Sequence, residues 1–400
     1  MSETLELLAG TAPQHLRQAP PLAPFSVPVL GFLAALSADL LGDPAWRAHP
    51  GLVALGFWLR PAGLARLRGH AALADPGSRR HAAGVVLHLA PGNVDNLFAY
   101  PWVISLLCGN ADVIRLSSRP SAERTALLGV IGRLLGDPAH AAIRARCAIV
   151  RYGHDDSVTG ELSALADRRV IWGSDTTIAH LRALPAPPLC QDVLFPDRQS
   201  AALLSAAAVG AATDLDPMVE ALYRDAYTFD QRACASPRLL VWLADGDVQP
   251  ARTRFWSAFA ACIAQRGPAF SEADLIDKLV AVHSVALDRD LVVEPASDQR
   301  LHRVRLVQPD ATVLAAHCGA GLFFEGIADD ADAVAQWLPR RTQTLTHWGL
   351  DSAAMDALCA ALADDMPDRL VPLGRALDFD PLWDGMDLFE RLSRRVRVTP

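Results

Sequence analysis

The sequence predicts an α/β protein of two units, the first with a parallel sheet that helices cover on both faces. Short apolar runs alternate with helix-like segments between residues 84 and 204, and a second alternation follows from residue 214. Strand–helix alternation of this kind is typical of parallel sheets. The composition agrees, because 400 residues that are 51% hydrophobic and 20% charged describe a well-packed globular chain of two or three domains.

The first unit is expected to contain four strands, each an apolar run that ends at a turn: residues 84–90, 112–116, 147–153 and 168–174. Helices are expected between and after them, at residues 96–108, 122–135 and 176–184. Gly109 stops the first of these helices and Ser121 caps the second. The earlier apolar run at residues 25–42 is interpreted as a core helix, because Pro28 and Asp39 leave it too short to cross a membrane.

The second unit continues the alternation. Its expected elements are helices at 214–229, 251–267 and 329–341 and strands at 238–243 and 319–328. Residues 199–209 are ambiguous. We predict four regions: an N-terminal helical segment (1–80) that packs on a cofactor domain (81–198), a catalytic domain (199–365) and a C-terminal return segment (366–400).

Charge and cysteine usage exclude several classes of protein. The formal net charge is −8 with no block of like charge, which argues against nucleic acid as a partner. The N-terminus, MSETLELLAG, is acidic where a signal peptide carries positive charge, and no apolar run suits a membrane span. The 7 cysteines form no CxxC pair and the 12 histidines have no metal-binding spacing. We therefore expect no disulfide framework, no metal and a cytoplasmic location.

Asn93 stands in a Pro91-Gly92-Asn93 turn that closes the first strand and opens a helix. Open α/β sheets bind ligands at this carboxyl end. The Asn93 amide is a neutral donor suited to a developing oxyanion. The same residues also suit a plain turn with a helix cap.

Two further strand ends suit phosphate groups. The strand at 112–116 leads into hydroxyl and guanidinium side chains: Arg115, Ser117, Ser118 and Arg119. They suit the 2′-phosphate of NADP, or equally a solvated loop, and the nearest acids are Asp112 and Glu123. Gly173 and Ser174 precede a helix start that can hold a pyrophosphate, although a plain strand-to-helix turn looks the same. The standard dinucleotide and P-loop motifs are absent from the sequence.

Cys234 stands in a polar segment, FDQRACASPR, between a helix and an apolar strand. A structural cysteine usually stands in an apolar run, as Cys108 and Cys262 do. The polar setting suits a reactive thiol as well as a buried one. Cys318 is the competing candidate, because His317 is adjacent and glycines give access.

Four stretches together resemble one family: APGNVDNLFAYPWVISLLCGNADVIRLSSRPS, IWGSDTT, FDQRACASPR and PLWDGMDLF. They look like the LuxC-type acyl-CoA reductases, known from bacterial bioluminescence operons, which belong to the aldehyde dehydrogenase superfamily. The resemblance runs from about His81 to the C-terminus. It implies an aldehyde-dehydrogenase-like fold, with a Rossmann-type cofactor domain and an α/β catalytic domain.

The resemblance implies a role for each candidate residue. Cys234 would accept the acyl group, and Asn93 is similar to the superfamily's oxyanion-hole asparagine. Arg115 falls where the superfamily usually has a phosphate-contacting lysine. Gly173 and Ser174 match the turn over the cofactor pyrophosphate.

Two departures from the superfamily pattern bear on the choice of cofactor and on whether the reaction is a reduction or an oxidation. Ser118 falls where NAD-preferring members often have a ribose-binding glutamate, and serine there, with Arg119 beside it, favours NADPH. The segment LCQDVLFPDRQSAALL lacks the glutamate with which oxidising members activate water, and only Asp192 and Asp197 could substitute. An acyl group on Cys234 would then survive to meet a hydride.

These inferences predict reduction of an acyl-CoA or acyl-protein thioester, with a fatty acyl chain expected, to the aldehyde. The predicted site comprises Cys234 and Asn93 for catalysis and, for NADPH, Arg115, Ser117, Ser118, Arg119, Gly173 and Ser174. Expected partners are an acyl-transferring synthetase or carrier protein and further copies of the chain. The alternatives are a cysteine acyltransferase or thioesterase and a non-catalytic acyl carrier. Four aromatic residues either line an acyl tunnel or fill the core: Phe229, Trp242, Phe323 and Phe324.

Overall fold

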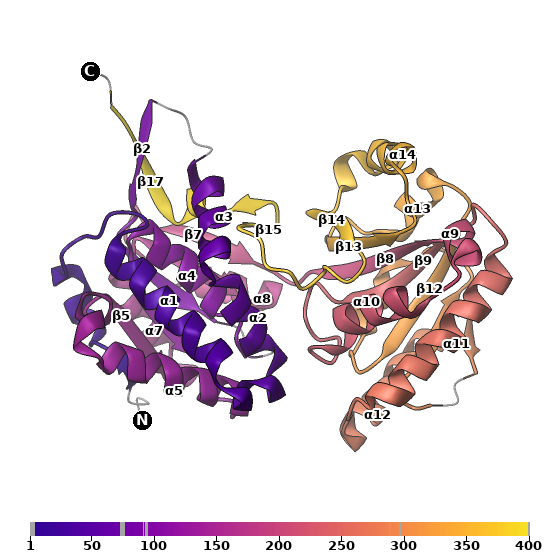
Figure 1. Cartoon of the computed structure of the whole chain (residues 1–400), viewed down its shortest axis with the longest axis horizontal. Coiled ribbons are helices and arrows are strands. Elements are labelled where there is room, and N and C mark those ends of the chain that lie inside the picture. Colours follow the sequence, from indigo (N-terminus) through magenta and orange to yellow (C-terminus); the bar gives the residue numbers. More distant parts are fainter. Residues whose placement is uncertain are drawn as a thin grey trace. The chain divides into compact units, whose positions relative to one another are not determined.

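The computed structural model describes residues 5–72, 77–90, 92, 95–287, 289–295 and 298–398. The chain packs as two units, Met1–Pro196 with Phe379–Pro400 and Asp197–Asp378. In Figure 1 the first unit runs from indigo to magenta and includes the yellow C-terminal strands, and the second runs from pink through orange to gold. Each contains a mainly parallel sheet with helices, so the predicted α/β fold class is confirmed.

The first unit is built on a six-stranded sheet in the order β1-β5-β4-β3-β6-β7. Its strands are β1 (Glu6–Gly10), β3 (Val85–Leu89), β4 (Ala111–Leu116), β5 (Cys147–Arg151), β6 (Arg168–Trp172) and β7 (Gln191–Phe195). β1 pairs antiparallel with β5, and the other pairs are parallel. Successive strands go outward from β3 to β5 on one side, whereas β6 returns to the other side of β3. Open α/β sheets bind ligands where the order reverses in this way, here between β3 and β6.

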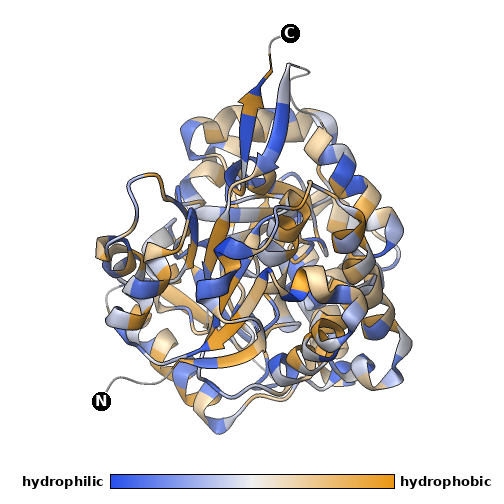
Figure 2. Cartoon of the chain, turned by 90° about the vertical axis from the view of Figure 1, so that its left-hand side faces the viewer, coloured by the Kyte–Doolittle hydropathy of each residue, from blue (hydrophilic) through white to orange (hydrophobic). Residues whose placement is uncertain are grey.

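Helices bury both faces of this sheet. They are α1 (Val27–Gly42), α2 (Pro50–Trp58), α3 (Pro61–Ala72), α4 (Ala99–Cys108), α5 (Ala122–Gly136), α6 (Ala141–Arg144), α7 (Asp156–Ala164) and α8 (Asp175–Ala183). All five residues of β3 and of β6 are buried, as is typical of parallel strands covered on both faces. Figure 2, which faces this unit, shows orange strands behind helices of mixed colour.

The N-terminal helices belong to the first unit. In α1, one side is buried in the core, including Phe32, Leu33 and Leu36, and the helix packs against α2, α4 and α5. Within the described part of the chain, no single helix is long and apolar enough to cross a membrane. One sharply bent pair, Ala122–Gly136 with Pro138–Arg144, reaches that length and composition when its two helices are taken together.

The second unit is built on a seven-stranded sheet in the order β10-β11-β12-β9-β8-β13-β14. The strands are β8 (Gln199–Ser205), β9 (Pro237–Leu243), β10 (Leu291–Glu294), β11 (His302–Leu306), β12 (Leu322–Ala328), β13 (Thr342–Trp348) and β14 (Arg369–Pro372). β10 pairs antiparallel with β11, and the other pairs are parallel. The ambiguous segment at 199–209 divides, since β8 ends at Ser205 and a short helix follows.

Two hydrophobic cores lie on opposite faces of the second sheet. One face is covered by α9 (Ala206–Ala211), α10 (Asp216–Tyr227) and α11 (Val248–Arg266), and the other by α12 (Glu272–Ala286), α13 (Ala331–Trp337) and α14 (Ser352–Leu362). Trp242 and Phe323 are fully buried on the α11 face, and Phe324 is fully buried on the α12 face. These three aromatic residues fill the two cores.

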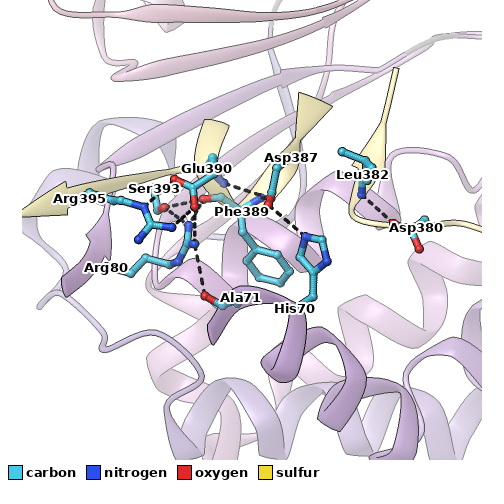
Figure 3. Close-up of polar contacts among 10 residues, drawn as sticks. All are labelled: His70, Ala71, Arg80, Asp380, Leu382, Asp387, Phe389, Glu390, Ser393 and Arg395. Carbon is cyan, nitrogen blue, oxygen red and sulfur yellow. Dashed lines mark hydrogen bonds and ion pairs between the residues drawn. The ribbon is translucent and has the colours of Figure 1, made fainter. Parts of the chain in front are cut away.

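The C-terminal segment returns to the first unit. It forms β15 (Leu382–Trp383), β16 (Met386–Asp387), α15 (Leu388–Arg391) and β17 (Ser393–Arg397), and β17 pairs antiparallel with β2 (Ser78–Ala82). Arg80 anchors this ribbon, because its guanidinium donates to the Phe389 carbonyl, to Ser393 Oγ at 2.6 Å and to Glu390 Oε1 at 2.8 Å (Figure 3). Beside it, His70 Nε2 lies 3.0 Å from Asp387 Oδ2.

We expect Arg80→Ala to lower the free energy of unfolding of the first unit by about 2–3 kcal/mol, because it removes charge-assisted hydrogen bonds from a largely buried guanidinium. Arg79→Ala is the matched control, since Arg79 is exposed on the same strand and makes no ion pair with a described carboxylate. Urea unfolding followed by circular dichroism measures both. Equal losses in the two variants would contradict the anchoring role.

Candidate active site

Three of the predicted turns lie together at one edge of the first sheet. In the parallel register, Leu89 of β3 is level with Arg115 of β4 and with Ile171 of β6, so the turns after these strands are neighbours. Gly92 approaches the next turn closely: a Cβ at this position would lie 3.2 Å from Ser117 Oγ. Asn93, the predicted oxyanion donor, lies outside the described residues. This edge is the reversal point where ligands bind in open α/β sheets.

Arg115 is held at this edge by the end of β5. Its guanidinium lies over the Tyr152 ring, 5.3 Å from the centroid, and donates to the Tyr152 and Gly153 carbonyls at 3.3 Å. Burial lowers the pKa of Arg115 from its usual value, yet an arginine stays charged in proteins. Because it forms no ion pair with a carboxylate in the described ranges, its charge is available to an anion.

The loop after β4 is shaped by its own hydroxyl groups. Ser117 Oγ accepts from the Arg119 amide at 3.2 Å, and Ser121 Oγ caps α5, as predicted, by accepting from the Arg124 amide at 3.1 Å. Ser118 Oγ reaches the Tyr152 carbonyl at 3.5 Å, a weak contact. The Arg119 side chain is exposed and makes no ion pair with a described carboxylate.

The two acids nearest this loop in the sequence are directed elsewhere. Asp112 is fully buried and lies 2.9 Å from His88 Nε2. Glu123 lies against α2, where a Cβ at Gly51 would meet its Oε1 at 2.6 Å. Burial and the nearby Asp95 raise the pKa of Glu123 to about 7. Neither carboxylate therefore faces Ser118 and Arg119 as a ribose-binding acid would.

Gly173 and Ser174 form a tight turn from β6 into α8. Ser174 Oγ accepts from the Thr177 amide at 3.2 Å and caps the helix. A Cβ at Gly173 would lie 2.9 Å from Thr177 Cγ2, so the turn has little room for a side chain. The two residues thus place the first turn of α8 at the carboxyl end of β6, beside the point where the strand order reverses.

Cys234 belongs to the second unit, in the loop between α10 and β9. It is partly exposed, and its carbonyl accepts from Ser200 Oγ at 2.7 Å. Two residues upstream have left-handed backbone, Asp230 with φ 52° and Gln231 with φ 59°. Such backbone at non-glycine residues costs on the order of 1–3 kcal/mol and clusters at functional sites.

A second loop clamps the strained one. It precedes β12, the neighbour of β9, and has positive φ at three successive residues, Gly319, Ala320 and Gly321. The buried Gln231 side chain joins the loops, donating to the Pro237 carbonyl at 2.9 Å and accepting from the Gly321 amide at 3.1 Å. These hydrogen bonds fix the backbone that carries Cys234.

Arg238, which the sequence reasoning did not single out, supplies positive charge beside this loop. Burial lowers the pKa of Arg238, while Cys234, Asp197 and Cys318 act on it electrostatically in the opposite direction. A nearby guanidinium favours the thiolate form of a cysteine. The residue stands at the end of the FDQRACASPR segment, so the sequence signal was present but unused.

The histidine beside the competing Cys318 is not available as a base. His317 donates from Nε2 to the Leu322 carbonyl at 2.7 Å and accepts at Nδ1 from the Gly319 amide at 3.1 Å. Burial, with a smaller effect of Arg238, lowers the pKa of His317 to about 3, so the imidazole is neutral and both nitrogens are occupied. Burial also raises the pKa of the Cys318 thiol.

Other cysteines are packed as apolar residues. Cys108 and Cys147 are fully buried, and burial raises the pKa of both thiols well above the usual value. Burial and Glu220 raise the pKa of Cys262 to about 11. A neutral thiol is a poor nucleophile, so these positions suit packing.

Asp192, one of the two acids considered as a water-activating base, is held in an ion pair. Arg169 donates to it through Nε at 2.8 Å and Nη2 at 3.0 Å. Asp197, the other candidate, is exposed to solvent. The Arg169 guanidinium thus engages both carboxylate oxygens of Asp192.

The two units together define an aldehyde dehydrogenase fold. An NAD-dependent aldehyde dehydrogenase from Sinorhizobium meliloti matches with a TM-score of 0.68 and 16% identity, over 96% of this chain and 85% of that one. A lactaldehyde dehydrogenase matches with a TM-score of 0.66 and 14% identity, over 97% of this chain and 90% of that one. An NAD-dependent benzaldehyde dehydrogenase from Corynebacterium glutamicum matches with a TM-score of 0.59 and 15% identity, over 93% of this chain and 84% of that one. The fold extends over the N-terminal helices as well.

The family is given by the sequence itself. The model of the acyl-CoA reductase (LuxC) family matches residues 74–395, most of the chain, and the protein belongs to that family. A search of curated proteins gave no match. The resemblance seen in the motifs is therefore confirmed, and family and fold together support an aldehyde-related oxidoreductase.

Proposed function

We propose that the protein reduces an acyl thioester, with acyl-CoA as the first candidate, to the aldehyde through an acyl group carried on Cys234. The observation that carries this proposal is the strained, clamped loop that holds Cys234 partly exposed beside the cationic Arg238. A thiolate is the nucleophile that thioester exchange requires. Membership of the acyl-CoA reductase family supports the same substrate class.

The residues of the chain would act in a fixed order. Cys234 Sγ attacks the carbonyl carbon of the thioester, the C–S bond to coenzyme A breaks, and the coenzyme leaves as a thiolate that takes up a proton. Arg238 stabilises the Cys234 thiolate before attack, and Asn93 is proposed to donate to the carbonyl oxygen as it becomes negative. After reduction, collapse of the thiohemiacetal on Cys234 releases the aldehyde and regenerates the thiolate.

NADPH is the proposed cofactor and, when bound, supplies the hydride for the reduction. The residues proposed to hold it stand at the carboxyl ends of β4 and β6, the two neighbours of β3: Arg115, Ser117, Ser118, Arg119, Gly173 and Ser174. They fit a phosphorylated nucleotide, because Arg115 and Arg119 carry charge without a described carboxylate partner and Ser174 caps the N-terminus of α8, where backbone amides can bind phosphate. Aldehyde dehydrogenases of the same fold that are named NAD-dependent support a nicotinamide cofactor.

The test of the function is NADPH consumption by the pure protein across acyl-CoA chain lengths, with the aldehyde trapped as its hydrazone. We expect oxidation of one NADPH for each aldehyde formed. Release of coenzyme A and free acid without NADPH oxidation would identify a thioesterase, and transfer to an added thiol or alcohol an acyltransferase. A stable acyl-protein that does not turn over would identify an acyl carrier. A carrier protein or synthetase as acyl donor is tested in the same assay.

The cofactor preference is a separate prediction. We expect kcat/KM for NADPH to exceed that for NADH by about tenfold or more, because one charge-assisted phosphate contact is worth about 1.5–3 kcal/mol. Arg119→Ala should narrow the gap. Arg144→Ala is the control, since Arg144 is another exposed arginine of the first unit. Equal use of the two cofactors by the unmodified protein would refute the NADPH preference. It would leave the proposed reductase activity unaffected.

A further inference from the structure

A pocket of about 620 Å³ lies in the second unit between α11, labelled in Figure 1, and the edge strand β10 with its neighbour β11. No residue of the loops that carry Cys234 and Cys318 lines it. Small-molecule sites typically have volumes of about 300–1,000 Å³. The pocket has the size of a ligand site that the proposed reductase chemistry does not use.

Behind the pocket wall lies a fully buried carboxylate, which contacts the lining residues Arg252 and Trp256. Glu325 of β12 accepts from Trp242 Nε1 at 3.2 Å, from Trp256 Nε1 and from Arg252 Nη2 at 2.5 Å. Arg252 also donates to Glu294 at 3.1 Å. A buried carboxylate is stable when donors and an opposite charge satisfy it, and this one has all three donors.

The carboxylates and guanidinium groups around Glu325 form ion pairs, and one guanidinium group takes part in none of them. Glu294 is shared by Arg252 and by Arg305, whose Nε lies 3.4 Å from it, so two carboxylates are matched by two guanidinium groups. Asp298, a further acid at the pocket, forms an ion pair with Arg300, whose Nε donates to Asp298 Oδ2 at 2.9 Å. These pairings leave the remaining arginine of the pocket wall, Arg303, without an ion pair to a described carboxylate, although Glu325 and Glu294 act on it electrostatically from further away.

Arg303 is placed to receive an anion. Its guanidinium lies over the Trp256 ring, 5.1 Å from the centroid, and reaches the Pro295 carbonyl at 3.5 Å. No described carboxylate lies within ion-pair distance of it. Arg252, which is 5% exposed, also keeps an Nε–H without an acceptor among the described residues. Two guanidinium groups at the pocket therefore retain unused donors.

We propose that this pocket binds a small organic carboxylate. One excess positive charge matches a monoanion, whereas a phosphate dianion would bring a second charge close to Glu294 and Glu325 without a cation to match it. A carboxylate fits the fork of the Arg303 guanidinium, and the hydroxyl of Ser257 lines the same wall. Ala260, Val292 and Leu301 offer apolar contact to the rest of the molecule.

Isothermal titration calorimetry with octanoate tests the proposal, with octanamide as the neutral probe of the same shape. We expect octanoate to bind the pure protein and octanamide to bind at least about tenfold more weakly, because a hydrogen bond to a charged group is worth about 1.5–3 kcal/mol. Arg303→Gln should weaken octanoate by a similar factor. Arg340→Gln, an exposed arginine of the same unit outside the pocket, should bind as the unmodified protein does.

A second variant keeps the test independent of the arginine cluster. Val292→Asp puts a negative charge on a part-exposed residue of the pocket wall, so it should repel octanoate and leave folding intact. No octanoate binding at millimolar concentration, equal affinity for octanamide, or undiminished binding by Arg303→Gln and Val292→Asp would each overturn the proposal. Reduction of acyl-CoA should be unchanged in both variants, which separates this site from the function proposed for Cys234.

Discussion

Replacement of Cys234 by alanine should lower kcat/KM for aldehyde formation by at least about 10³-fold, since removal of a covalent nucleophile leaves only binding and electrostatic contributions. Stability should change by no more than about 0.5 kcal/mol, because the residue is partly exposed and its contact to Ser200 is through the backbone carbonyl. The variant should therefore keep its fold and lose the ability to carry the acyl group.

Cys318→Ala is the matched control for this variant. Cys318 stands in the loop that clamps the Cys234 loop, it is also partly exposed, and its neighbour His317 is neutral with both ring nitrogens occupied. We expect this variant to keep its activity within a small factor. Mass spectrometry after incubation with an acyl-CoA should find one acyl group, labile to hydroxylamine, on the peptide that contains Cys234. An adduct on Cys318 instead would make the assignment wrong.

The strands that were predictable from the sequence are the ones with continuous apolar runs. β3 and β6 are buried throughout because helices cover both faces of the sheet, and burial of that kind leaves an apolar run in the sequence. β13 was missed, since its buried residues include Thr344 and Thr346, which a hydrophobicity pattern does not reveal. β11 was missed for a related reason: it lies next to the edge strand β10, and arginines alternate along it.

That the strand-end side chains of the proposed cofactor site lie near one another could be predicted, because carboxyl ends of neighbouring parallel strands meet at one edge. The conformation of the Cys234 loop could not. The left-handed backbone at Asp230 and Gln231 is fixed by hydrogen bonds to the distant Gly321 and to Pro237, and no local sequence rule requires it at a non-glycine residue.

Asn110 illustrates how a local signal can conceal a long-range role. It follows Gly109, which ends α4 with φ 89°, as the sequence predicted. Its fully buried side chain also accepts from the Ala83 amide at 2.7 Å and donates to the Leu392 carbonyl at 2.7 Å, joining the C-terminal segment to the sheet. Partners 27 and 282 residues away cannot be read from a turn motif.

Without a nicotinamide donor, the acyl group on Cys234 should persist, hydrolysing about 10²-fold or more slowly than it is reduced when NADPH is present. A positioned general base contributes about 10²–10⁴-fold to such a hydrolysis. Of the two acids considered for that task, Asp192 is held by Arg169 in a bidentate pair, and Asp197 is exposed to solvent. Neither carboxylate is both buried and free of an arginine partner, as a general base that activates water would be.

Single-turnover kinetics on the isolated acyl-protein measures the two fates separately. Addition of NADPH should discharge the acyl group as a burst of aldehyde, while the same protein in buffer alone should release free acid slowly. Asp197→Asn is the control for the remaining acid, and we expect it to leave the slow rate unchanged, because the Asp197 carboxylate is exposed to solvent. Free acid released in buffer as fast as aldehyde appears with NADPH would make the protein a hydrolase or an oxidising dehydrogenase. A slow rate in buffer that falls further in Asp197→Asn would instead give Asp197 a role as a weak base while leaving reduction as the faster route.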